Sequence, residues 1–211
     1  PHEPARRRRA PLPLRAALAV SVALGVLARG SAPAQADPST DARASADALF
    51  REGQALLDAG REAEACPKLA ASYELDPATG ALLALALCYE GIGRVASAWS
   101  AYSEVATRAA RDGREDRVAA ARGRADALEP RLPKLVIEVD DEVQRLPGFT
   151  VTRNDVAVAR AALGSALPVD PGRQVVVVGA TGKLRAQLEA DASEGQTATL
   201  RLAGMLEPDV S

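Results

Sequence analysis

The chain has 211 residues, a length that suits one domain or two small ones. Its 26 basic and 28 acidic residues nearly balance, and its only histidine is His2. Beyond that position the sequence therefore excludes a Ser-His-Asp or Cys-His nucleophile system, an imidazole general base and a histidine-containing metal site.

The first 36 residues have the three parts of a secretory signal peptide. Arginines occupy positions 6–9, an apolar run covers 16–28, and small residues lead to Ala34 and Ala36 in an A-x-A pattern. We expect cleavage after Ala36, so that contact with the membrane is only transient. A membrane anchor is the alternative, but Arg15 and Arg29 interrupt the apolar run, and a span needs about 20 apolar residues.

Removal of residues 1–36 would change the charge of the chain. It takes away six arginines and Glu3, which leaves 26−6=20 basic and 28−1=27 acidic residues and a net charge of −7. Such a chain lacks the basic surface that drives binding to phosphate backbones. Nucleic acid is therefore not an expected partner.

After a polar lead-in over 37–45, the segment 46–129 has helical periodicity and repeats itself. Leu56, Gly60, Ala65 and Leu69 have counterparts 33 residues later, at Tyr89, Gly93, Ala98 and Tyr102. Periods of 20–50 residues are typical of stacked helix pairs, because one pair alone cannot bury its apolar face. A narrow apolar stripe on the otherwise charged segment 114–128 predicts a further helix that caps the stack; its members are Val118, Ala121, Ala125 and Leu128.

The repeated segment resembles the tetratricopeptide repeat, with Pro77 at the position of its closing proline. An unrelated pair of helical hairpins is the alternative. The resemblance implies that the first helix of each copy lines a groove for a protein or peptide, although core positions for Phe50 and Leu83 fit the pattern equally well. The implied groove residues are Asp47, Phe50, Gln54, Leu57 and Asp58 in the first copy, and Leu83, Leu87 and Glu90 in the second. The basic clamp of the carboxylate-binding repeats is absent.

The only two cysteines are Cys66 and Cys88, and the repeat register places them in neighbouring antiparallel helices. In an oxidising compartment such a pair tends to form a disulfide. Packed neighbouring helices can bring the two Cα atoms within the roughly 4.4–6.8 Å that the bond requires. Two buried free thiols are the alternative.

Residues 130–133 contain two prolines and predict a linker, after which the apolar period changes to two. Short extended runs between turn residues predict a small antiparallel β-sandwich over 134–203, followed by a tail over 204–211. The expected strands cover 135–139, 149–153, 156–159, 167–169, 174–178, 183–190 and 197–202. The segment is similar to PEGA-type domains through G-x3-P at 164–168 and D-P-G-x-x-V-x-V at 170–177. An unrelated immunoglobulin-like sandwich is the alternative.

The stretch VVVVGATG at 175–182 resembles the first strand and phosphate-binding turn of a dinucleotide fold. However, Arg185 stands where the third glycine would be needed, and residues 183–190 alternate as a strand does, where that fold requires a helix. GATG is therefore expected to be the turn of a hairpin. The sequence predicts no cofactor, no metal site and no catalytic residue.

These features predict an α+β protein in two domains, with an α-helical repeat array of about five helices before a small antiparallel β-sandwich. We expect a non-enzymatic scaffold of the periplasm or cell envelope that binds a protein or peptide through its helices. One alternative is a glycan- or surface-binding sandwich on a helical stalk. A nucleotide-dependent enzyme that uses the GATG turn is a second, disfavoured alternative.

Overall fold

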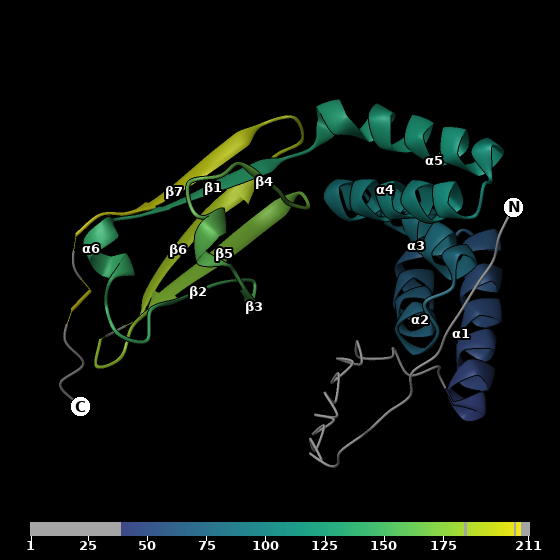
Figure 1. The fold of residues 1–211 in the computed structure, drawn as a ribbon, viewed down its shortest axis with the longest axis horizontal. Helices are drawn as coiled ribbons and strands as arrows, with labels where there is room; N and C mark the ends of the chain where they lie inside the picture. Colours follow the sequence, from purple (N-terminus) through teal and green to yellow (C-terminus); the bar gives the residue numbers. More distant parts are fainter. Residues whose placement is uncertain (1–38, 184, 205, 208–211) are drawn as a thin grey trace, which may run out of the picture. The chain divides into compact units, whose positions relative to one another are not determined.

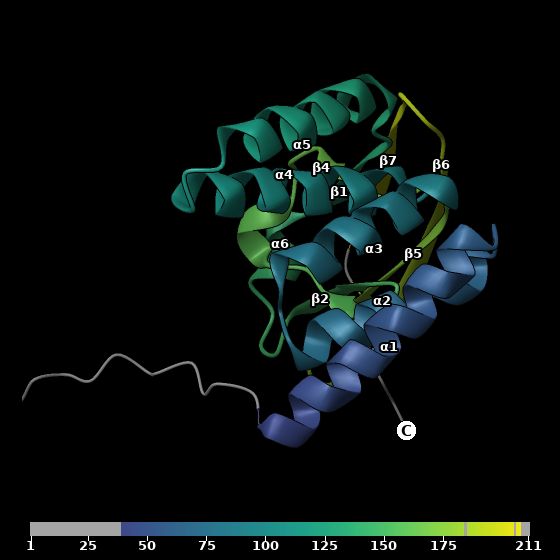
Figure 2. The ribbon, with the colours of Figure 1, turned by 90° about the vertical axis from the view of Figure 1, so that its right-hand side faces the viewer.

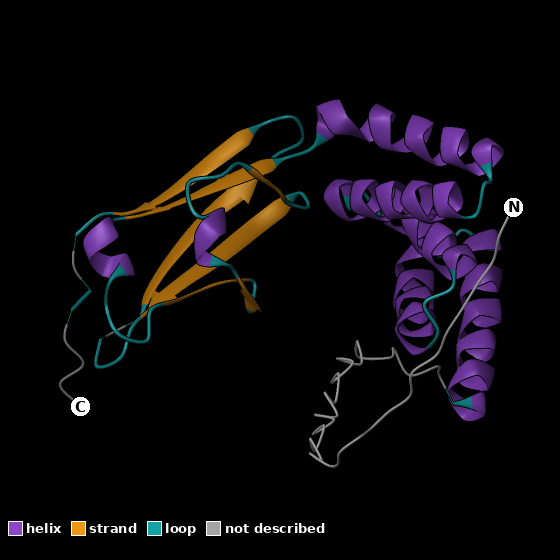
Figure 3. Ribbon diagram, viewed as in Figure 1, coloured by secondary structure: helices purple, strands orange, loops and turns teal. Residues whose placement is uncertain are grey.

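The computed structural model describes residues 39–183, 185–204 and 206–207. In this part of the chain, five helices of 13–19 residues precede a region rich in strands (Figures 1 and 3). The five helices are α1 (Thr40–Asp58), α2 (Glu62–Leu75), α3 (Thr79–Gly91), α4 (Val95–Arg111) and α5 (Glu115–Leu128). The predicted α+β class is thereby confirmed. The predicted signal peptide, with Ala34 and Ala36, lies outside the described residues.

The five helices pack in chain order, each against the next (Figure 2). The turns after α1 and α3 are closed in the same way by Gly60 and Gly93, which have φ of +67° and +73°. At each turn the following arginine donates its backbone N–H to a carbonyl five residues earlier, at 2.9 and 2.8 Å. This glycine-containing helix end satisfies carbonyls that the helix leaves free. The repeated glycines of the sequence thus mark equivalent turns.

Helix α5 covers the end of the stack with the apolar stripe that the sequence predicts. Val118, Ala121, Ala125 and Leu128 are buried, with at most 6% of each residue exposed. Three of them, Ala121, Ala125 and Leu128, share a core cluster with α3 and α4 residues such as Leu82 and Tyr102. The opposite face of α5 is charged, as expected for a capping helix.

The first two helices make an unusually close approach at Gly53. A Cβ atom built on this glycine would lie 2.7 Å from both Cγ and Cδ2 of Leu69, whose side chain is fully buried. Nearby, the hydroxyl of Ser72 donates a 2.9 Å hydrogen bond to the carbonyl of Ala46. These two contacts fix α1 against α2.

The strands that follow form two sheets. One has the order β4-β1-β7 and the other β3-β2-β5-β6. Their bounds are β1 (Lys134–Val139), β2 (Thr150–Arg153), β3 (Val156–Ala157), β4 (Leu167–Pro168), β5 (Gly172–Gly179), β6 (Ala186–Ala192) and β7 (Thr197–Leu202). Short helices lie before β1, after β1 and before β4: η1 (Glu129–Arg131), α6 (Asp141–Gln144) and η2 (Arg160–Ala162). The sequence pattern indicated none of these three.

The core of the β region consists of side chains from both sheets. Leu135 and Ile137 of β1 pack in one cluster with Val176 and Val178 of β5, and each is at most 1% exposed. The expected hairpin is confirmed, because β5 and β6 are antiparallel and Val178 pairs with Ala186 across the GATG turn.

One strand pair departs from the expected antiparallel pattern. Strands β1 and β7 are parallel, in a register that runs from Lys134 with Thr197 to Val139 with Leu202. The other four pairs are antiparallel. Alternation along one strand gives the same signal for both directions of a partner, so the sequence pattern could not distinguish them.

Candidate functional site

Two predicted groove residues, Leu83 and Leu87, line a groove of about 400 Å³ between α3 and α5. They are 38% and 43% exposed and lie four residues apart, on one face of α3. We call this the α3–α5 groove. It is lined by Thr79, Gly80, Leu83 and Leu87 of α3, Tyr102 and Val105 of α4, and Arg117, Ala120, Ala121 and Arg124 of α5.

The leucines are exposed because α3 is apolar on every side. All eight residues from Ala81 to Cys88 are apolar, and α2 and α4 cover only part of this helix. Leu82, Leu85 and Ala86 face these neighbours and are at most 5% exposed. A helix that is apolar all round is normally buried. The outward leucines therefore form an aliphatic surface that the other described residues leave partly exposed.

The floor and one end of the groove carry a polar network. Tyr102 is 1% exposed, and its hydroxyl donates a 2.7 Å hydrogen bond to Oε2 of Glu90. Burial, together with the hydrogen bond to this carboxylate, raises the pKa of Tyr102, so the phenol stays a donor. Arg124 Nη1 lies 3.2 Å from both carboxylate oxygens of Glu90. Glu90 of α3 thus contacts both α4 and α5 at this end of the groove.

Arg117 stands at the other end of the groove and has no described carboxylate partner. The helix neighbours that could face it are Gly113, Arg114, Ala120 and Ala121, and none of these is acidic. The adjacent Asp116 interacts instead with Arg114, at 3.5 Å. The guanidinium of Arg117 is therefore available beside the exposed leucines.

The contact between Glu90 and Arg124 indicates which residue of α3 Arg117 faces. Glu90 and Arg124 are in contact and are 34 residues apart. Leu83 and Arg117 have the same separation, 117−83=34. Because two turns reverse the chain between α3 and α5, these helices run in similar directions, and equal separations place residues opposite each other. The sequence reasoning did not assign Arg117, Arg124 or Tyr102 to a binding site. The repeat period of 33 residues, close to this separation, was the signal that could have found the two arginines.

The five predicted groove residues of α1 do not line the α3–α5 groove. Asp47, Gln54 and Asp58 are exposed elsewhere on α1. Phe50 and Leu57 are half-buried and pack against the core cluster between α1, α2 and α3. Phe50 therefore occupies a core position, which was the alternative to a groove position, whereas Leu83 is exposed.

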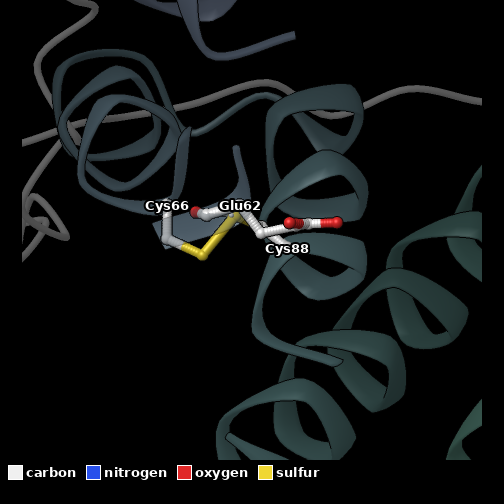
Figure 4. Close-up of a disulfide and its surroundings, with 3 residues drawn as sticks. All are labelled: Glu62, Cys66 and Cys88. Carbon is white, nitrogen blue, oxygen red and sulfur yellow. Dashed lines mark hydrogen bonds between the residues drawn. A yellow bond between two sulfur atoms is a disulfide. The ribbon is translucent and has the colours of Figure 1, made fainter. Parts of the chain in front are cut away.

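Cys66 of α2 and Cys88 of α3 form a disulfide in the structure (Figure 4). Their Cα atoms are 5.5 Å apart, and both residues are at most 5% exposed. Sγ of Cys88 also lies 3.2 Å from the carbonyl oxygen of Glu62. A disulfide sulfur has no hydrogen to donate, so this is a packing contact. The bond links the two copies of the repeat directly behind the groove-lining helix.

A second, larger cavity of about 770 Å³ is lined partly by aromatic residues of α2, α3 and α4. These are Tyr73, Tyr89 and Trp99. Arg108 lies over the ring of Tyr73 at 5.4 Å, and Arg94 lies over that of Tyr89 at 4.3 Å. Such cation–π contacts occupy one face of each tyrosine. The aliphatic side chains of the α3–α5 groove have no comparable cover.

Asp170, which also lines the larger cavity, binds the start of α4 from the β4–β5 connection. Its carboxylate accepts hydrogen bonds from Ser97 N at 2.8 Å, Ser97 Oγ at 2.6 Å and Arg94 Nε at 2.8 Å. Burial alone would raise the pKa of Asp170, but these hydrogen bonds outweigh it and hold the pKa below its usual value. Because Arg94 provides no side-chain cap, Asp170 serves as the acidic cap of α4.

None of the helices in the described part of the chain is both long and apolar enough to cross a bilayer. Comparison with protein-family models and with curated proteins finds no match for this chain. The resemblances to tetratricopeptide repeats and PEGA-type domains therefore rest on the residues of the chain itself.

Proposed function

We propose that this chain is a non-enzymatic, exported interaction module that binds a segment of a partner protein in the α3–α5 groove. The observation that carries the proposal is the pair of exposed leucines, Leu83 and Leu87, above a well-packed floor. Exposed aliphatic side chains in a groove rimmed by polar residues are typical of protein interaction sites.

The surroundings of the leucines support binding without a large rearrangement. The floor residues Tyr102 and Val105 are at most 2% exposed, and the buried disulfide holds α3 to α2. A groove with fixed walls loses little conformational entropy when a partner binds. Export is supported by the three-part leader at 1–36 and by a cysteine pair suited to an oxidising compartment.

The experiment is proximity labelling in envelope fractions with a charged double variant of the groove. Leu83→Asp with Leu87→Asp should abolish labelling of specific proteins, because carboxylates replace the apolar contact surface. The matched control is Leu75→Asp with Ile92→Asp, since these residues are 38% and 39% exposed and lie outside the groove. It should keep the labelling pattern of the unchanged chain.

Circular dichroism spectra should show that both double variants remain helical. Labelling that is identical for the groove variant and the unchanged chain would contradict the proposal. That result would favour the alternative in which the β-sandwich binds a glycan or surface and the helices act as a stalk.

A further inference from the structure

Among the described residues, the α3–α5 groove combines an aliphatic surface with an arginine, Arg117, that no described carboxylate contacts. This combination specifies the chemistry of its ligand. We propose that the groove recognises a polypeptide segment in which an aliphatic side chain is followed or preceded closely by an acidic group. This proposal rests on the function proposed above. The aliphatic side chain packs between Leu83 and Leu87, and the acidic group binds Arg117.

The aliphatic half of the site follows from the lining. Leu83 and Leu87 form one wall, Val105 and the ring of Tyr102 form the floor, and Ala120 and Ala121 are the small residues of the opposite wall. Small residues opposite large ones leave room for one side chain between them. The phenol of Tyr102 already donates to Glu90, so its hydroxyl is not available to a ligand on this floor.

The acidic half of the site follows from the unequal states of the two arginines. Arg124 is held by Glu90 at 3.2 Å, whereas Arg117 has no carboxylate partner among the described residues. A free guanidinium can donate two parallel hydrogen bonds to a carboxylate. Without residues 1–36 the chain is acidic, with a net charge of −7 from 20 basic and 27 acidic residues. Arg117 is thus a local positive charge on an acidic protein.

The arrangement also gives the bound segment a direction. Arg117 lies opposite Leu83, and Glu90 stands at the other end of the groove, beyond Leu87. A ligand carboxylate placed at that end would meet the negative charge of Glu90. The acidic group therefore binds at the Arg117 end, and the aliphatic side chain lies toward Leu87.

A polypeptide fits this surface better than a lipid does. An acyl chain would need a continuous apolar channel for its many methylenes, but here the aliphatic surface ends after two leucines at the Glu90–Arg124 ion pair. The short apolar surface therefore suits the side chain of a polypeptide.

The test is selection of random linear peptides by display on the full chain. We expect enrichment of sequences in which Leu, Ile, Val or Met lies within a few residues of Asp, Glu or the terminal carboxylate. Arg117→Glu should lower the affinity of the selected peptides by about tenfold, because one charge-assisted bidentate contact is lost. A new selection on that variant should enrich Lys or Arg in place of the acid.

Arg122→Glu is the matched control, because Arg122 is an exposed α5 residue outside the groove and the charge change is the same. It should leave the affinity of the selected peptides within about twofold of the unchanged chain, as expected for screened charges. Leu83→Asp with Leu87→Asp should abolish binding altogether.

The outcomes separate this proposal from the function on which it rests. If peptides require the leucines but show no acidic residue and respond equally to Arg117→Glu and Arg122→Glu, the ligand chemistry is wrong and the interaction function stands. If no selected peptide depends on the leucines, or none is selected, both are wrong. Arg117-dependent binding to phosphatidylglycerol vesicles in place of peptides would also overturn the ligand class.

Discussion

The close approach of α1 and α2 at Gly53 makes a single alanine substitution informative. In a helix interior alanine is about 1 kcal/mol more favourable than glycine. At Gly53, however, the new methyl group would lie 2.7 Å from two atoms of the fully buried Leu69. Overpacking of a filled core costs about 1–3 kcal/mol. We therefore expect Gly53→Ala to lower the free energy of unfolding by about 1 kcal/mol.

Gly123 of α5 offers a matched control, because a Cβ built there meets no atom within 4 Å. Gly123→Ala should raise the free energy of unfolding by about 1 kcal/mol, since only the helix propensity changes. Thermal unfolding followed by far-ultraviolet circular dichroism should show shifts of about 2–4 °C in opposite directions. An equal stabilisation by both substitutions would refute the close packing of α1 on α2.

Three further predictions concern covalent, polar and acidic contacts. Reduction of the Cys66–Cys88 disulfide, whose residues are 22 apart, should lower the free energy of unfolding of the helices by about 3.4 kcal/mol. Urea titrations followed by the fluorescence of the single tryptophan, which lies in α4, measure this change, and the double alanine variant should not respond to reductant. Tyr102→Phe should cost about 1 kcal/mol in the same titration, because the Glu90 carboxylate loses one of its two described hydrogen-bond donors and keeps only Arg124; an unchanged midpoint would contradict this role. Folding lowers the pKa of Asp170, so its contribution to the free energy of unfolding is complete above the unfolded pKa near 3.8. This contribution is lost as the pH falls through the folded pKa. Asp170→Asn should therefore be less stable than the unchanged chain at neutral pH, and a stability difference that persists undiminished in acid would be inconsistent with this titration.

Features set by local periodicity were predictable from the sequence. The stripe of α5 is buried as expected, and the glycines at 60 and 93 close equivalent turns. The GATG stretch turns a hairpin because residues on both sides alternate as strands do. In each case neighbouring residues of the chain decide the structure, so the pattern contains the necessary information.

Features that depend on contacts between distant segments were not predictable in this way. The cap that Asp170 provides for Ser97 joins residues 73 apart, and no local pattern indicates it. The predicted groove residues of α1 were taken from the repeat register, which does not tell which helix faces are covered. Phe50 packs against the core there, whereas Leu83 at a comparable position is exposed. Arg117 was missed because its importance comes from its position opposite Leu83 and not from any motif.

The parallel pairing of β1 with β7 has a consequence for how the protein is made. Lys134 of β1 pairs with Thr197, 63 residues later, so the first strand of the sheet region gains this neighbour only after the last strand has been synthesised. The helices, by contrast, contact mainly their neighbours in the chain and can pack while synthesis continues. A nascent chain that stops before Thr197 leaves one edge of β1 without its hydrogen-bonded neighbour. Truncation within the last strand should therefore yield a folded helical array that carries an unfolded, aggregation-prone remainder.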